Sequence, residues 1–132
     1  MCMKIVNLTP HPITILSEED IQYNPMIRKW TTSKQNVVPI AQIPSQGIVN
    51  AKTSVEHCDP INGIPVMRKA LAGVDPLPSE ESNTIFVVSA LYATSYRKLH
   101  PESKAKLYTI ADPVYTEDGR TVLGSRGICE AF

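Results

Sequence analysis

Proline is spread along most of the chain, and this distribution limits the length of any regular element. The 132-residue sequence contains 11 prolines, and Pro25, Pro39 and Pro44 fall within residues 21–46. Each proline lacks a backbone N–H donor and favours an extended conformation in the residue before it. We therefore expect short strands separated by turns, and no long helix in residues 21–46, which we interpret as the least regular part of the chain.

The apolar residues favour strands over helices in most of the chain. Thr84–Val88 gives the strongest prediction, because an unbroken run of β-branched and aromatic residues is typical of the centre of a sheet. Asp118–Gly119, between two β-favouring runs, indicates a hairpin. His57–Gly63 has the composition of a turn. The other candidate strands span residues 4–8, 13–16, 36–40, 47–55, 64–69, 106–110, 114–116, 121–123 and 127–132.

One helix is predicted over Ala90–Leu99. Ser89 is a suitable N-cap, and Pro101 would end the helix. The sequence thus predicts an α+β fold: a mostly antiparallel sheet of about seven short strands with one principal helix. The length suits a single domain that covers residues 1–132.

Charge and cysteine content exclude several classes of protein. Lys plus Arg and Asp plus Glu are both 13, so the chain lacks the basic excess of a protein that binds nucleic acid polymers. Cys2, Cys58 and Cys129 are odd in number and form no CxxC motif, which argues against a disulfide framework or a zinc site. The N-terminus lacks the apolar core of a signal peptide, and Ser82–Tyr96 is too short and polar to cross a bilayer. We expect a cytoplasmic protein with no membrane partner, metal or cofactor.

Three segments together resemble a family of small phage and bacterial proteins that opens with NLTPHP and closes with a D-x-G-R hairpin. The segments are NLTPHPI at 7–13, TIFVVSAL at 84–91, and 112–124, where this chain has Glu117-Asp118-Gly119-Arg120 in the turn. After the turn it has Gly124–Ser125 where the family has Gly-Cys, so no role falls on a cysteine there. The resemblance implies a fold more than an activity. A fainter likeness, in size and chemistry alone, is to phage sponge proteins that sequester cyclic nucleotide immune signals; it would place the protein in a host cytoplasm.

The arginines suggest where an anionic ligand would bind. Arginine presents a planar fork that matches phosphate and stacks on aromatic rings. All five arginines lie on or near predicted turns or element ends, and three of them belong to Arg-Lys pairs beside apolar or aromatic residues. The alternative is that these side chains are solvated or form weak surface ion pairs. The predicted ligand-binding residues are Arg68, Arg97, Arg120 and Arg126 for phosphate and Tyr92 and Tyr96 for stacking.

Other candidate sites have weaker signals. Gly124–Gly127 resembles an anion-binding nest, but a β-bulge or turn is the favoured interpretation. His57, Cys58 and Asp59 are consecutive, and neighbours in an extended chain point to opposite faces, so a shared metal is disfavoured. No GxSxG, HExxH or GxGxxG motif is present, and no catalytic residue is predicted.

The sequence thus favours non-catalytic sequestration of a phosphate-bearing small molecule, such as a cyclic nucleotide or an ADP-ribose-type signal, at a homo-oligomer interface. The first alternative is a protein-interaction module that inhibits a host protein and uses segment 21–46 with Trp30 as its anchor. The second is a small hydrolase that acts on the same nucleotide.

Overall fold

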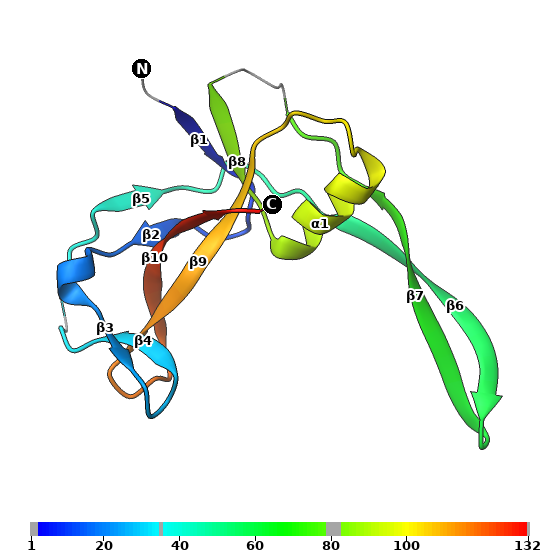
Figure 1. Cartoon of the computed structure of the whole chain (residues 1–132), viewed down its shortest axis with the longest axis horizontal. Helices are drawn as coiled ribbons and strands as arrows, with labels where there is room; N and C mark the ends of the chain where they lie inside the picture. The colour runs from blue at the N-terminus through cyan, green and yellow to red at the C-terminus, as the bar shows by residue number, and fades with distance from the viewer. Residues whose placement is uncertain (1–2, 35, 79–82, 132) are drawn as a thin grey trace.

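The computed structural model describes residues 3–34, 36–78 and 83–131, and β-strands make up most of it (Figure 1). The elements in chain order are β1 (Lys4–Asn7), β2 (Ile13–Ile15), the 3₁₀ turn η1 (Glu18–Asp20), β3 (Gln22–Asn24), β4 (Lys29–Thr32), β5 (Ala41–Ile43), β6 (Ala51–Ile61), β7 (Ile64–Val74), β8 (Thr84–Val87), α1 (Ala90–Leu99), β9 (Leu107–Thr116) and β10 (Val122–Glu130).

Two sheets are present among the described residues. The larger one has eight strands: its main path is β1-β8-β9-β10-β2-β5, β4 adds to β9, and β3 adds to β4. Within it the pairs β1–β8, β8–β9, β10–β2 and β4–β9 are parallel, and β9–β10, β2–β5 and β3–β4 are antiparallel. The smaller sheet is the antiparallel hairpin β6–β7. The larger sheet is therefore mixed.

The predicted fold class is wrong, because strands dominate the structure and its main sheet is mixed instead of mostly antiparallel. The reason lies at β8, where all four residues are buried. This strand pairs in parallel with β1 on one side and β9 on the other. The connection from β8 to β9 passes through α1, as a parallel crossover requires. A strand that is apolar on both faces is typical of parallel pairing, so the composition of residues 84–88 was itself a sign of it.

The predicted helix and the predicted hairpin turn are both present in the structure. Helix α1 has the predicted bounds, and the Ser89 hydroxyl accepts a hydrogen bond from the Tyr92 N–H at 3.1 Å. The hairpin around Asp118–Gly119 is also present: β9 and β10 pair across it, and Gly119 has φ +74°. The strands on either side are longer than predicted, since β9 runs through Pro113 and β10 runs through the 124–127 segment. The register of β10 shifts between Val122 and Gly124, as a bulge would produce.

Several predicted boundaries are wrong. Residues 57–61 belong to β6, because the turn needs only Asn62 and Gly63, both with positive φ. Segment 21–46 contains β3, β4 and β5, and the short strand predicted at 36–40 lies instead at Ala41–Ile43. Residues 2 and 132, which include Cys2 and the end of the last predicted strand, lie outside the described residues. Within the described part of the chain, no helix has the length and apolar character needed to cross a membrane.

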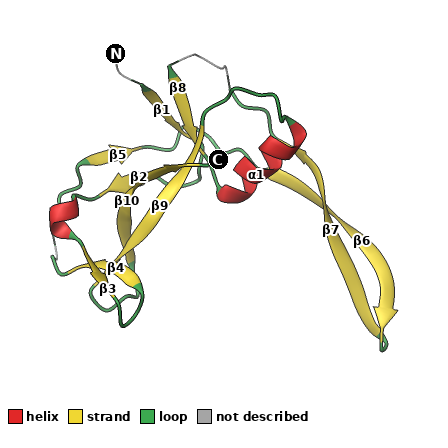
Figure 2. Ribbon diagram, in the orientation of Figure 1, coloured by secondary structure: helices red, strands yellow, loops and turns green. Residues whose placement is uncertain are grey.

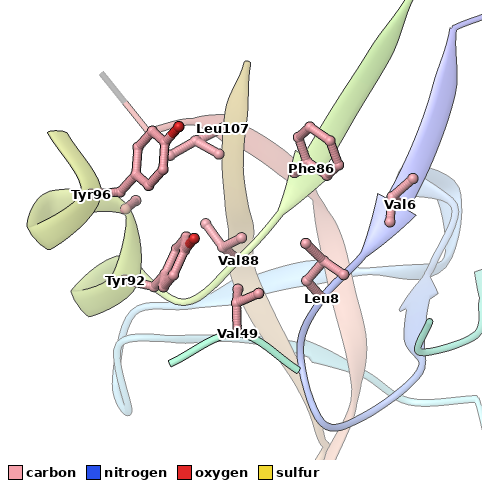
Figure 3. Close-up of a cluster of buried hydrophobic side chains, with 9 residues drawn as sticks. Val6, Leu8, Val49, Phe86, Val88, Tyr92, Tyr96 and Leu107 are labelled. Carbon is pink, nitrogen blue, oxygen red and sulfur yellow. The ribbon is translucent and has the colours of Figure 1, made fainter. Parts of the chain in front are cut away.

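The main hydrophobic core lies between helix α1 and the β1–β8–β9 part of the sheet (Figure 3). Tyr92 and Tyr96 of α1 point into it, toward Val88 and Leu107. The buried cluster consists of Val6, Leu8, Val49, Phe86, Val88, Tyr92, Ala93, Tyr96 and Leu107. The core therefore combines segments from residue 6 to residue 107. Helix α1 also contacts β6 and β7, and these contacts hold the base of the two strands against the helix.

A buried asparagine organises the chain after β1. Asn7 is fully buried, and its amide Nδ2 donates to the backbone carbonyls of His11 at 2.8 Å and Ile43 at 3.1 Å. Its Oδ1 accepts from the backbone N–H of Thr9 at 3.0 Å and from the Thr9 hydroxyl at 2.6 Å. One side chain thus holds the proline corner at 9–12 and ties it to β5. The NLTPHP segment has a structural role that its composition alone does not reveal.

Candidate functional site

The two predicted stacking tyrosines belong to the core. Tyr92 is fully buried and its hydroxyl donates to the Asp75 backbone carbonyl at 2.6 Å. Tyr96 is almost fully buried, its hydroxyl lies 3.0 Å from Ser103 Oγ, and its ring stacks on Tyr92 at 5.9 Å between centroids. Neither ring has a face open to a ligand in this chain. The two tyrosines are four residues apart on α1 because that face of the helix packs on the sheet.

Arg126 is engaged by neighbouring groups within the chain. Its guanidinium lies over the Trp30 ring at 3.8 Å from the centroid, and Nη1 donates to Asp112 Oδ2 at 3.0 Å. Nη2 lies 3.5 Å from Glu18 Oε1. The stacked guanidinium covers one face of Trp30. The Tyr23 ring packs edge-on against the Trp30 ring, with 5.3 Å between the ring centroids. Trp30 is therefore a half-buried packing residue on β4. It does not offer the free aromatic ring that a protein-interaction module anchored by Trp30 would need.

The other three predicted arginines are exposed and lie on different elements. Arg97 is on the outer side of α1, and Arg120 is in the turn between β9 and β10. Arg68 is on β7, and 71% of its side chain is exposed. The four arginines are thus distributed over α1, the β9–β10 hairpin and the β6–β7 hairpin, and one chain does not gather them into a single site.

The turn that holds Arg120 is built by its neighbours. The Asp118 carboxylate accepts hydrogen bonds from the Thr116 hydroxyl and from the Arg120 backbone N–H, and these bonds lower the pKa of Asp118. A Cβ at position 119 would lie 2.9 Å from Ile27 Cδ1, in addition to the strain of its positive φ. The sequence of this turn is explained by its geometry without a ligand.

The most distinctive surface feature is the β6–β7 hairpin, which we call the arm. Figures 1 and 2 show it extending away from α1 and from the rest of the molecule as a two-stranded ribbon. Its strands are 11 residues each, and residues 52–69 are all exposed except the half-buried Val66. Nothing in the described chain packs on either face of this outer segment strongly enough to bury it.

The base of the arm is held firmly. The backbone N–H of Asp75 donates to the Asn50 carbonyl at 3.0 Å, and the Asn50 N–H donates to the Asp75 carboxylate at 2.9 Å. Lys52 Nζ lies 3.4 Å from the same carboxylate. With the Tyr92 hydroxyl on the Asp75 carbonyl, these contacts fix the direction in which the arm leaves the core.

Large apolar side chains are exposed along the arm. Val55, Ile61, Ile64 and Met67 are each between 54% and 65% exposed. The register places Val55 and Met67 on one face, together with His57 and Lys69, and places Arg68 and Glu56 on the other. Arg68 Nη2 contacts Glu56 Oε2 at 2.5 Å, an exposed pair of the kind that contributes about 0–1 kcal/mol.

The His57-Cys58-Asp59 run lies in β6, where alternation separates its side chains between the two faces. Among the described residues, no group of three or more His, Cys, Asp or Glu side chains lies close enough together to hold a metal ion. Cys58 and Cys129 are exposed free thiols.

A second feature is an open, mostly apolar pocket of about 410 Å³ where β2, β9 and β10 meet, which we call the β2–β10 pocket. It is lined by His11, Pro12, Ile13, Thr14, Ile110, Pro113, Val122, Leu123, Gly124 and Ser125. Gly124 permits the close approach of β10 to β2, since a Cβ there would lie 2.8 Å from the Thr14 carbonyl oxygen. Ile110, Val122 and Leu123 leave part of the pocket wall exposed.

Sequence reasoning predicted a turn within residues 57–63 between strands at 47–55 and 64–69, but it did not predict the length of the arm, and it missed the pocket. The signal for the arm was Asn62–Gly63, which favours a type I′ hairpin turn, directly flanked by Ile61 and Ile64. The pocket had no local signal, because it joins residues 11–14 to 110–125. Comparison of the chain with protein-family models, with curated proteins and with solved structures gave no match.

Proposed function

We propose that this protein is a non-catalytic binding protein that acts as a homo-oligomer assembled through the arm, and that it sequesters a phosphate-bearing small molecule between its copies. The observation that supports this most is the arm itself, which presents Val55, Ile61, Ile64 and Met67 to solvent on a ribbon with little core of its own. The ligand class is that of a cyclic nucleotide or an ADP-ribose-type signal.

Physical chemistry argues that the arm is covered in the working protein. A two-stranded hairpin is at best marginally stable in water, and exposed apolar patches of this kind mark interaction sites. Residues 52–69 form an eighteen-residue surface, close to the roughly 20–30 residues that one side of a standard interface contributes. The partner we propose for this surface is a second copy of the chain.

The distribution of arginines supports a ligand site between copies more than one within a chain. Arg68 lies on the arm, on the face opposite Val55 and Met67, so assembly through the apolar face would leave its guanidinium accessible beside the neighbouring copy. Its partner Glu56 is itself half exposed, so the ion pair costs little to exchange for a phosphate. Arg120, exposed in the β9–β10 turn, is a second guanidinium available to such a site.

Charged substitutions on the arm are expected to dissociate the oligomer. The double variant Val55→Glu, Met67→Glu places two carboxylates on the apolar face and should be monomeric by native mass spectrometry and light scattering, where the wild type is oligomeric. Both positions are exposed in the single chain, so the circular dichroism spectrum should change little, and Tm should fall only by the stabilisation that assembly provides. Val38→Glu, at an exposed position outside the arm, is the control and should remain oligomeric. A monomeric wild type would overturn the assembly proposal.

Removal of Arg68 is expected to weaken ligand binding about tenfold to a hundredfold, the effect of losing a charge-assisted hydrogen bond worth roughly 1.5–3 kcal/mol. The measurement is titration calorimetry of wild type and Arg68→Ala against cyclic nucleotides and ADP-ribose. Lys69→Ala is the matched control, because the adjacent side chain lies on the opposite face of the arm. Equal affinities for wild type and Arg68→Ala would remove Arg68 from the site, and absence of binding by the wild type would contradict the ligand class.

The same sample distinguishes the two other functions. A ligand recovered intact after denaturation agrees with sequestration, whereas a hydrolysed product would indicate a hydrolase. A stoichiometric host protein retained on the purified chain, with no small molecule, would favour an inhibitor of that protein.

A further inference from the structure

We propose that the tip of the arm of one copy seats in the β2–β10 pocket of a second copy, an inference that rests on the arm-mediated assembly proposed above. The tip is the segment 59–65, where Ile61 and Ile64 pair on either side of the Asn62–Gly63 turn. The tip exposes two large apolar side chains, and the pocket has a mostly apolar lining that is open to solvent.

The tip is suited to insert side chains and not to extend a sheet. Pro60 and Pro65 flank the turn in β6 and β7, and neither has a backbone N–H to offer a neighbouring strand. Ile61 and Ile64 are the outermost large side chains, and both are mostly exposed. The tip therefore exposes two isoleucine side chains beside a compact turn.

The β2–β10 pocket is suited to receive them. Its volume of about 410 Å³ lies within the range of roughly 300–1,000 Å³ in which proteins hold small organic groups. Its wall is formed by side chains such as Ile13, Ile110 and Leu123. Pro12 and Pro113 also line it, and their rings restrict the local backbone. Burial of the tip isoleucines there would remove apolar surface of both partners from water.

The tip and the pocket each carry a polar side chain that can pair with the other. Asp59 is the one charged side chain in the tip segment 59–65. Among the described residues that line the pocket, His11 is the one titratable side chain. The Asp59 carboxylate would thus accept a hydrogen bond from an imidazole N–H of His11 in the pocket lining, which would set the orientation of the inserted turn.

Geometry requires that the tip and the pocket belong to different copies. The arm leaves the core beside α1 and points away from β2 and β10 (Figure 1). An 11-residue strand spans about 36 Å at roughly 3.3 Å per residue, against a radius of gyration of about 14 Å for a domain of this length. Because the two surfaces are different, each copy both gives a tip and receives one, either reciprocally in a two-fold dimer or head-to-tail in a ring.

Two single variants test this inference by complementation. Ile61→Glu disables the tip and leaves the pocket intact, whereas Val122→Glu disables the pocket and leaves the tip intact; both positions are exposed, and Tm measurements verify folding. We expect each variant alone to be monomeric by native mass spectrometry. An equimolar mixture, with one chain ¹⁵N-labelled, should form a one-to-one heterodimer, since one intact tip and one intact pocket remain.

Each other outcome is decisive. If Ile61→Glu is monomeric while Val122→Glu assembles like the wild type, the arm still mediates assembly but its receptor is another surface. If both variants alone are monomeric and the mixture forms no heterodimer, the contact is symmetric and the tip–pocket inference is overturned. If both variants assemble like the wild type, the inference is also overturned, and a monomeric wild type overturns the assembly proposal itself.

Discussion

Replacement of Asn7 by aspartate is expected to lower the free energy of unfolding by about 2–6 kcal/mol. The two side chains are nearly identical in shape, but aspartate has no amide hydrogens, so the backbone carbonyls of His11 and Ile43 lose their donor. Each buried acceptor left unpaired costs roughly 1–3 kcal/mol. The carboxylate would also be desolvated at a fully buried position, so the effect should lie toward the upper end of that range. Urea-induced unfolding at neutral pH measures it.

Asn24→Asp provides a matched control for this experiment. Asn24 uses its Oδ1 to accept the Met26 backbone N–H at 3.0 Å, a role that a carboxylate keeps. The exposed setting of that bond predicts a change within about 0.5 kcal/mol. If Asn7→Asp were equally mild, the hydrogen-bond network would not hold the proline corner in place.

Alkaline pH is expected to destabilise the fold through Tyr92. Burial, followed by the neighbouring Tyr96 and Asp75, raises the pKa of Tyr92 from 10.0 to about 12. In the unfolded chain the phenol has a pKa near 10, so it loses its proton at lower pH there than in the folded protein. The stabilisation is therefore fully present below about pH 10 and is lost as the pH rises through the folded pKa of about 12. Two pKa units correspond to roughly 3 kcal/mol.

Comparison with Tyr92→Phe isolates this effect from the titration of lysines and other groups. At about pH 9 the variant should be less stable by roughly 1 kcal/mol, because it lacks the hydrogen bond to the Asp75 carbonyl. Near pH 12 the order should reverse, because phenylalanine has no proton to lose. Parallel stability curves for the two proteins over this range would show that the phenol does not titrate differently in the folded and unfolded states.

The segments that resemble a known family have structural explanations in this chain. Asn7 and Thr9 of the NLTPHP segment form a closed hydrogen-bond network, and Asp118 and Gly119 shape the β9–β10 turn. Residues 84–88 form a buried parallel strand. None of these roles needs a ligand. Two of these segments also line the β2–β10 pocket, through residues such as His11 and Pro113, whereas the arm lies outside all three.

The sequence by itself determined those features that a few neighbouring residues control. Ser89 and Pro101 bound α1, and Asp118–Gly119 specify a turn, because caps and turns satisfy backbone groups within a few positions. The apolar run at 84–88 likewise identified the central strand.

Only the tertiary structure decided strand direction, burial and the grouping of side chains. Whether β8 pairs in parallel depends on β1 and β9, which lie far from it in the chain. Tyr92 is a core residue because α1 lies on the sheet, and Arg126 is occupied because β4 places Trp30 beneath it. Such contacts join segments separated by tens of residues, so a pattern of neighbouring residues cannot predict them.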